Sequence, residues 1–370
     1  PESERATVAA FQGAVDLDPE FVAAWARLVR AQAWLLRRGL ETDTMPARRS
    51  LDAIQALDPG GADALYAEGV YEYYGRGDYE SALAALQAAR RFRPGDPEIM
   101  QHEGWVLRRL GRWDEAMELI DQAIQLDPRN PTLLWNQGLN NYRLRRFGTG
   151  RRQFEMALDL DPGGPIVGAF ATEVRLFSEG DSAAARRTLE AGRGLEAPGQ
   201  KDALAYWLAY TARDYDRAIE LARGLTGEPA VVLTSSTIRR SHSRAMRLAL
   251  AYRMAGDDEA ARTWADTAVA EASAALAGRP EPVPWDRFGA AASAHAFLGT
   301  SLALRDEPGD AEEAVGHAEE AVRLYGYDRD SQDSDTFDWL LVRTYVHAGR
   351  PDEAIEFMEE LLSLSLIHIS

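Results

Sequence analysis

Few residues of this 370-residue chain have the types and spacing that catalysis or metal binding requires. Its six histidines form no His-Glu-x-x-His pair, so the sequence does not support a zinc protease. Cysteine is absent, which excludes disulfides and thiolate metal sites. No serine or histidine is placed as part of a catalytic set. The sequence therefore predicts a protein that is not an enzyme and that needs no metal or cofactor.

Two short motifs resemble ligand-binding loops but lack essential residues. "GTGRRQ" (148–153) lacks the third glycine of a nucleotide loop and follows no strand, so we expect it at a turn between helices. "DRDSQDSD" (328–335) gathers carboxylates, but an EF-hand needs glycine and glutamate where Asp333 and Trp339 stand. We interpret it as a polar loop that caps a helix beginning near Thr336.

The charge of the chain limits the partners that it can bind. The net charge of −18 repels nucleic acid and anionic lipid, so we expect no direct nucleic-acid binding. No apolar stretch is long enough to span a bilayer, and we expect no membrane insertion of this segment. Lys201 is the only lysine, so the positive sites are nearly all arginines, which can hold a carboxylate through two parallel hydrogen bonds.

The chain repeats itself with a fixed period. The phrase "AIQLDPRN" (123–130) returns in varied form, and its prolines Pro59, Pro94, Pro128 and Pro162 are 35, 34 and 34 residues apart. Other positions keep nearly the same step, namely Tyr79, Trp113 and Phe147; Leu86, Ile120 and Phe154; and Gly69, Gly104 and Gly138. Self-similarity at such a period is typical of a stack of repeated structural units.

Each unit is predicted to contain two helices. "PEIMQHEGWVLRRLG" (97–111) has apolar residues at helical spacing and stops at a glycine. "RWDEAMELIDQAIQL" (112–126) forms the second helix, which the following Asp-Pro ends because proline cannot continue a helix. A single helical hairpin cannot bury its own apolar face, so neighbouring copies must bury one another.

These residues resemble the tetratricopeptide repeat family. The resemblance is close in "GWVLRRLGRWDEAMELIDQAIQLDPRNP" (104–131) and in "GVYEYYGRGDYESALAALQAARRFRPGDP" (69–97). It implies an all-α fold, a right-handed superhelix of antiparallel helix hairpins, or α-solenoid, with about eight to nine repeats.

We divide the chain into three parts by how well the repeat pattern is kept. Residues 1–192 form a regular array that starts within a second helix, and residues 193–363 form a divergent array that continues the superhelix. "RGLEAPGQK" (193–201) is either an inter-repeat loop or a joint between two stacks, and we favour one continuous superhelix. "LSLIHIS" (364–370) abandons the pattern and is interpreted as a non-native or frayed tail.

In this family the first helix of each hairpin lines the concave surface, where partners bind. Carried over by register, the resemblance assigns to this surface Tyr66, Tyr73, Gln101, His102, Trp105, Arg108, Arg109, Trp135, Asn136, Tyr142 and Arg143. The preceding repeat adds Arg27, Arg30 and Trp34. Aromatic and arginine side chains dominate binding hot spots, so we expect a peptide or protein partner with acidic and apolar residues.

A purely structural interpretation of the same residues remains open. Trp105 and Trp135 could be buried between hairpins, and Arg108 and Arg109 end a helix, where positive charge meets the dipole favourably. Asn136 occupies one position of the carboxylate clamp of chaperone adaptors, but the lysine and asparagine partners of that clamp are missing. Binding of chaperone tails is therefore not expected.

The predicted function is a non-enzymatic scaffold that binds a peptide or protein partner in the concave groove. The repeats are similar to those that accompany serine/threonine kinase, nucleotide cyclase or winged-helix domains in large bacterial signalling proteins, which implies a regulatory or recruiting role. One alternative is a ligand- or peptide-sensing module that controls an attached catalytic or DNA-binding domain. Another is a divergent enzyme that uses clustered carboxylates of the second half. We expect a cytoplasmic location, or an extracytoplasmic one if a membrane span precedes the repeats.

Overall fold

The computed structural model describes residues 2–37, 40–162, 172, 175, 180–192, 200–225, 243–278, 290–327, 330 and 334–367. The helices of the first half are α1 (Glu2–Leu17), α2 (Val22–Arg37), α3 (Met45–Leu57), α4 (Ala62–Val70), the π-helical η1 (Tyr71–Arg76), α5 (Tyr79–Phe92), α6 (Pro97–Arg109), α7 (Trp113–Leu126), α8 (Pro131–Arg143) and α9 (Phe147–Leu160). Those of the second half are α11 (Ser182–Ala191), α12 (Gln200–Thr211), α13 (Tyr215–Gly224), α15 (Arg244–Ala255), α16 (Asp258–Ala277), α17 (Ala290–Arg305), α18 (Asp310–Leu324), α19 (Asp335–His347) and α20 (Pro351–Ile367). The described residues contain no strand, so the predicted all-α class is confirmed.

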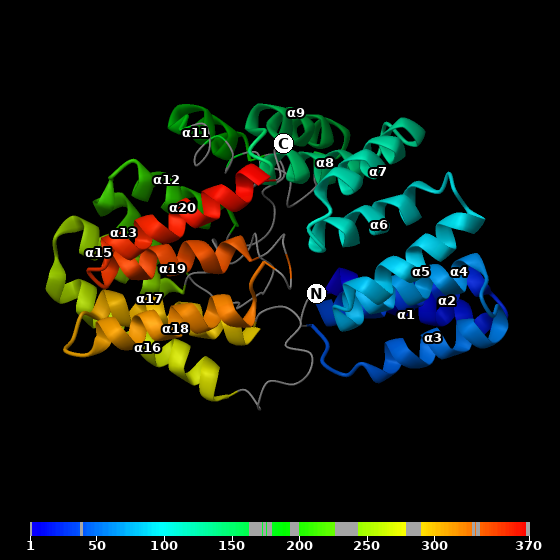
Figure 1. The fold of residues 1–370 in the computed structure, drawn as a ribbon, viewed down its shortest axis with the longest axis horizontal. Helices are drawn as coiled ribbons and strands as arrows, with labels where there is room; N and C mark the ends of the chain where they lie inside the picture. Colours follow the sequence, from blue (N-terminus) through cyan, green and yellow to red (C-terminus); the bar gives the residue numbers. More distant parts are fainter. Residues whose placement is uncertain are drawn as a thin grey trace.

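The helices pack as consecutive hairpins, which confirms the predicted α-solenoid. Within the described ranges, eight hairpins are complete, and the pairs are α2 with α3, α4 with α5, α6 with α7, α8 with α9, α12 with α13, α15 with α16, α17 with α18, and α19 with α20. Figure 1 shows the hairpins following a curve from α1–α5 on the right, over α8 and α9 at the top, to α15–α18 on the left. The last helices thereby return toward the first ones.

The local sequence explains where the helices begin and end. Asp96 and Asn130 accept hydrogen bonds from backbone amides of the first turns of α6 and α8, each just before a proline at the first helical position. Gly111 has a φ of 75°, a left-handed conformation that glycine adopts without a steric penalty, and it separates α6 from α7. The predicted two-helix unit is therefore confirmed in this repeat.

One sequence motif lies elsewhere than expected. Residues 148–153 were predicted at a turn, but they lie in the first turns of α9. The turn precedes them, because Arg145 adopts a left-handed φ of 59°. The predicted boundary between the two arrays adjoins residues 193–199, which lie outside the described ranges. Of the predicted tail, residues 368–370 also lie outside these ranges, whereas helix α20 includes the tail as far as Ile367.

The periodic glycines lie under the periodic large residues of the partner helix. A Cβ atom added to Gly104 would lie 2.8 Å from Cδ1 of Ile120, and one added to Gly138 would lie 2.6 Å from the ring of Phe154. Ile120 and Phe154 are fully buried. The missing side chain lets the two helices of a hairpin approach closely, and this explains why both sets of positions share one period.

Gly299 of α17 makes the closest approach to a neighbouring backbone, and we predict a stability effect from it. A Cβ atom there would lie 2.5 Å from the carbonyl oxygen of Ala314 in α18. Gly299→Ala should lower the free energy of unfolding by about 1–3 kcal/mol, because α17 and α18 must separate. Gly316→Ala in the exposed face of α18 meets nothing within 4 Å and should raise it by about 0.5–1 kcal/mol. Urea unfolding followed by circular dichroism measures both, and equal effects would contradict the packing argument.

Candidate functional site

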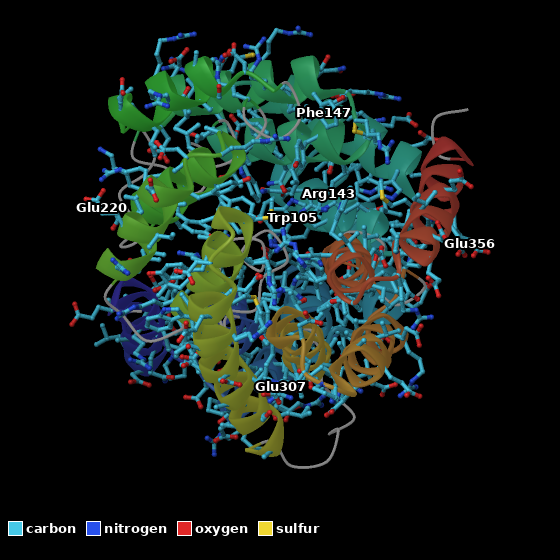
Figure 2. All side chains as sticks on the ribbon, turned by 90° about the vertical axis from the view of Figure 1, so that its left-hand side faces the viewer. Trp105, Arg143, Phe147, Glu220, Glu307 and Glu356 are labelled. Carbon is cyan, nitrogen blue, oxygen red and sulfur yellow. The ribbon has the colours of Figure 1, made fainter. Side chains whose placement is uncertain are left out.

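Side chains of the first helices of successive repeats converge on the inner side of the curve. Arg27 and Arg30 of α2 and Tyr66 of α4 all contact Glu98, at the start of α6. In Figure 2, which is turned by 90° from Figure 1, Trp105 and Arg143 are labelled toward the middle of the molecule, whereas Glu220 and Glu356 lie at its periphery. The structure thus brings several predicted residues together across repeats.

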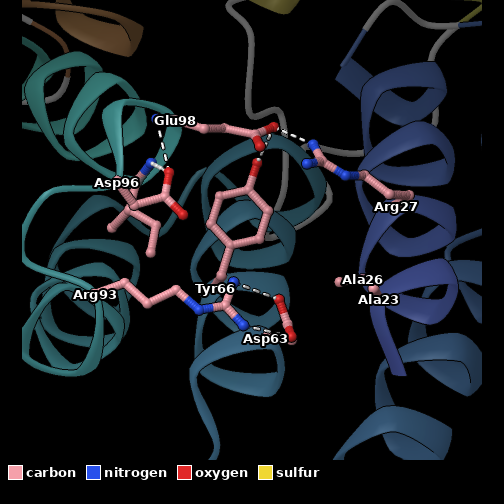
Figure 3. Close-up of a pocket in the computed structure, with 9 residues that line it drawn as sticks. Ala23, Ala26, Arg27, Asp63, Tyr66, Arg93, Asp96 and Glu98 are labelled. Atoms are coloured by element: carbon pink, nitrogen blue, oxygen red, sulfur yellow. Dashed lines mark hydrogen bonds and ion pairs between the residues drawn. The ribbon is translucent and has the colours of Figure 1, made fainter. Parts of the chain in front are cut away.

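Glu98 is the centre of the first cluster on this inner side. Its Oε1 atom accepts hydrogen bonds from the Tyr66 hydroxyl at 2.9 Å and from Arg27 (Figure 3). It also accepts a hydrogen bond of 3.1 Å from Arg30 Nη1. Although burial raises the pKa of Glu98, the bond from Arg27 and the nearby positive charges lower it below its usual value. Arg27 and Arg30 therefore already hold an internal carboxylate, which the sequence analysis did not single out.

A small cavity of about 180 Å³ adjoins Glu98 (Figure 3). Its lining comprises Ala23, Ala26, Arg27, Asp63, Tyr66, Arg93, Asp96, Glu98 and Ile99. The charged groups at its rim are paired, since Arg93 donates two hydrogen bonds, of 2.9 and 2.7 Å, to the carboxylate of Asp63. Pockets that enclose drug-sized ligands measure about 300–1,000 Å³, so this cavity is smaller than a typical small-molecule site.

His102 lies buried next to this cluster. Its Nδ1 atom is 2.9 Å from the carbonyl oxygen of Glu98, and a carbonyl can only accept, so Nδ1 carries the hydrogen of the neutral ring. The ring packs edge-on against Tyr66 and tilted against Trp105, with centroids 5.4 and 4.6 Å away. Burial lowers the pKa of His102 to about 4, against the opposing effects of its backbone hydrogen bond and of Glu98. His102 is therefore neutral at pH 7.

Asp330 is the centre of a second cluster, and it belongs to the stretch that was predicted to be a helix-capping loop. Ser334 occupies the N-cap of α19 without a side-chain capping bond. Asp330 is fully buried, and its Oδ2 atom accepts from Arg109 Nη1 at 2.6 Å, the Tyr325 hydroxyl at 2.8 Å and the Tyr79 hydroxyl at 3.0 Å. Burial and the charge of Asp330 both raise the pKa of Tyr79. Residues 328, 329 and 331–333 of the predicted loop lie outside the described ranges, and Asp330 itself is paired with residues more than 200 positions away.

The third group of predicted residues lies on α6 and α8. Buried Arg108 donates through Nη1 to Asn136 Oδ1 and Asn140 Oδ1, at 3.1 Å each, and so joins the two helices. On the same two helices, four other predicted side chains are half-buried and keep part of their area exposed. We call these four residues the α6–α8 surface: Trp105, Trp135, Tyr142 and Arg143.

The remaining predicted residues are buried by contacts within the chain. They are Tyr66, Tyr73, Gln101, His102, Arg108, Arg109 and Asn136. Tyr73, for example, accepts a hydrogen bond of 3.4 Å from Arg109 Nε. A direct role of these seven residues in binding stays a prediction, whereas the four residues of the α6–α8 surface keep part of their area exposed.

In the described part of the second half, the carboxylates show no arrangement typical of acid–base catalysis. A general acid would have a raised pKa, but the shifted carboxyl pKa values in the described part of that half are lowered by a hydrogen bond from a neighbouring arginine. The pairs are Asp310 with Arg305, Glu320 with Arg323, and Glu353 with Arg350. The same described residues contain no group of three or more side chains suited to hold a metal ion.

Comparison with known families identifies the repeats. Three models of the tetratricopeptide repeat match residues 43–97, 73–136 and 339–368. These stretches of the chain are therefore tetratricopeptide repeats, as the repeat register indicated. Among curated protein sequences, none matches this chain significantly.

A solved structure agrees with this fold. A tetratricopeptide repeat protein from Parabacteroides merdae is 17% identical, with 76% of this chain and 98% of that chain covered and a TM-score of 0.51. PilF of Pseudomonas aeruginosa is 23% identical over 55% of this chain and 89% of its own, with a TM-score of 0.44. Yeast Tom70 is 15% identical over 100% and 84%, with a TM-score of 0.49. At 17% identity, the likeness to the Parabacteroides merdae protein concerns the fold alone.

The membrane prediction was checked on the helices of the described ranges. None of them is both long and apolar enough to cross a bilayer.

Proposed function

We propose that this chain is a non-enzymatic protein-interaction scaffold that binds a peptide segment of its partner on the α6–α8 surface. The observation that supports it best is the grouping of three half-buried aromatic rings and one arginine on the first helices of adjacent repeats. These residue types make the largest contributions in protein interfaces. The buried residues Arg108, Asn136 and Asn140 beneath them fix the two helices relative to each other. The loss of conformational entropy on binding is therefore small.

The chemistry of this surface favours an acidic partner with apolar side chains. Arg143 is half-buried and can hold a carboxylate through two hydrogen bonds. The Nε1 atom of Trp105 is buried and has no hydrogen-bond partner among the described residues, and buried polar groups are rarely left in this state. An acceptor oxygen of a bound peptide would satisfy this donor, while the rings of Trp135 and Tyr142 offer apolar contact.

Selection from a random peptide library displayed on phage tests this proposal. We expect the wild-type chain to select peptides that combine acidic with aromatic or aliphatic residues. Arg143→Glu should weaken the selected peptides at least about tenfold, because it replaces an attraction by a repulsion. Arg129→Glu is the matched control, since Arg129 is exposed in the turn between α7 and α8. Equal loss in both variants, or loss in neither, would contradict the assignment of the α6–α8 surface.

The sequence resemblance supports a wider setting for this scaffold, as the regulatory or recruiting part of a larger bacterial signalling protein in the cytoplasm. We favour the scaffold over a small-molecule sensor because the cavity beside Glu98 is small and its charged groups are paired. A sensor would show a rise in melting temperature with a saturating ligand.

A further inference from the structure

The pairing of Asp330 joins distant repeats. Arg109 ends α6 and Tyr79 begins α5, whereas Tyr325 and Asp330 follow α18. In the sequence, Asp330 is thus 221 positions from Arg109 and 251 positions from Tyr79, and it forms a hydrogen bond with each. We call Arg109, Tyr79 and Tyr325 the carboxylate cage. It lies where the returning C-terminal helices meet the inner side of the first repeats.

The hydrogen-bond donors of the carboxylate cage are suited to bind an anion. One guanidinium and two hydroxyl groups donate to the same oxygen atom of Asp330, at 2.6 to 3.0 Å. Arg37 is also buried here and interacts electrostatically with Arg109, Tyr79 and Tyr325. One buried guanidinium, that of Arg109, therefore pairs directly with this carboxylate, and an amide or a hydroxyl in its place would leave that charge less well compensated.

We propose that the carboxylate cage is a peptide-binding site of the inner side and that Asp330 is its built-in ligand. An acidic side chain of a partner then binds by taking the place of Asp330. This inference rests on the proposed role of the inner side in peptide binding, and it names the recognised chemistry as a side-chain carboxylate. It also explains why a cationic site of this kind is fully occupied in the free chain.

Competition with a tethered ligand has a measurable consequence. A ligand in the same chain has an effective concentration in the millimolar range, so a free ligand must compete against it. A single carboxylate added from outside should therefore bind the wild-type chain poorly. Removal of the Asp330 carboxylate should raise the affinity of the cage for a free acidic peptide at least about tenfold.

The chain itself supplies the probe for this experiment. A fluorescein-labelled peptide of residues 326–336, "GYDRDSQDSDT", carries Asp330 in its own sequence context. We expect fluorescence anisotropy to show binding to the full-length Asp330→Ala chain at least about tenfold tighter than to the wild-type chain. A peptide with asparagine in place of this aspartate should bind Asp330→Ala at least about tenfold more weakly. The double variant Asp330→Ala/Arg109→Gln should lose the binding.

The outcomes separate this proposal from the previous one. If Asp330→Ala keeps its helical circular dichroism but binds the aspartate and asparagine peptides equally, or binds neither, the cage is not a carboxylate-binding site. Asp330→Asn provides the same comparison if the alanine variant does not fold. Because the probe comes from this chain, the result does not depend on phage selection. Failure of Arg143→Glu to weaken selected peptides would overturn only the α6–α8 surface.

Discussion

Replacing Arg109 with methionine is expected to lower the free energy of unfolding by about 3–5 kcal/mol. Arg109 is 5% exposed, and its guanidinium donates a hydrogen bond of 2.6 Å to Asp330, which is fully buried. Methionine fills much of the same volume but leaves the carboxylate charged without its main partner. The cost of a buried, unpaired charge far exceeds that of losing a surface ion pair. Urea unfolding followed by circular dichroism measures this loss.

A double-mutant cycle shows whether the unpaired charge is the cause. Arg109→Met/Asp330→Asn removes both charges and should be less destabilised than Arg109→Met alone. Arg91→Met on the exposed side of α5 controls for the substitution itself and should change stability by less than about 0.5 kcal/mol. If Arg109→Met and Arg91→Met are equally stable, the pair between Arg109 and Asp330 does not hold the distant repeats together.

The second large effect is a pH dependence of the free energy of unfolding that arises from His102. Its pKa is about 4 in the folded chain and about 6.5 when unfolded, so the unfolded chain binds a proton first as the pH falls. The contribution of neutral His102 to the free energy of unfolding is therefore fully present above pH 6.5 and is lost as the pH falls from 6.5 toward 4. A shift of this size corresponds to about 3 kcal/mol. We expect urea unfolding at pH 7.5 and 4.5 to show a loss of this order from His102.

A variant isolates this contribution from other titrating groups. His102→Gln removes the titration, so its stability should fall less between pH 7.5 and 4.5 than that of the wild-type chain. Part of the fall will remain, because burial also lowers the pKa of His347 to about 4. An imidazole resonance of His102 that titrates near pH 6.5 in the folded chain would disprove the assigned burial effect.

The regular part of the fold was predictable from the sequence because local chemistry determines it. Asp-Pro and Gly111 mark helix ends through backbone geometry, and the period of 34 residues indicates stacked hairpins. Even the contact between Gly138 and Phe154 follows from two sets of positions with one period. Gly299 makes an even closer contact, yet it lies in the divergent half, where no clear period singled it out.

The sites formed by distant repeats were not predictable in the same way. The register placed Arg109 on a first helix, but no local pattern connects it to Asp330, 221 residues further on. Their contact depends on the curvature summed over the intervening hairpins, which a single repeat does not encode. Tyr66 and His102, which the register alone assigned to an open groove, are buried by contacts with each other, with Glu98 and with Trp105. The acidic composition of residues 328–335 was the available signal for Asp330.

Hydrogen exchange of the full chain, with and without a saturating peptide from the phage selection, tests the proposed binding surface most directly. The account predicts slower exchange in α6 (Pro97–Arg109) and α8 (Pro131–Arg143), which carry the α6–α8 surface. Exchange in α7 and α9, the second helices of the same hairpins, should change much less. Protection confined to α7 and α9, or no protection at saturation, would contradict peptide binding on the inner side.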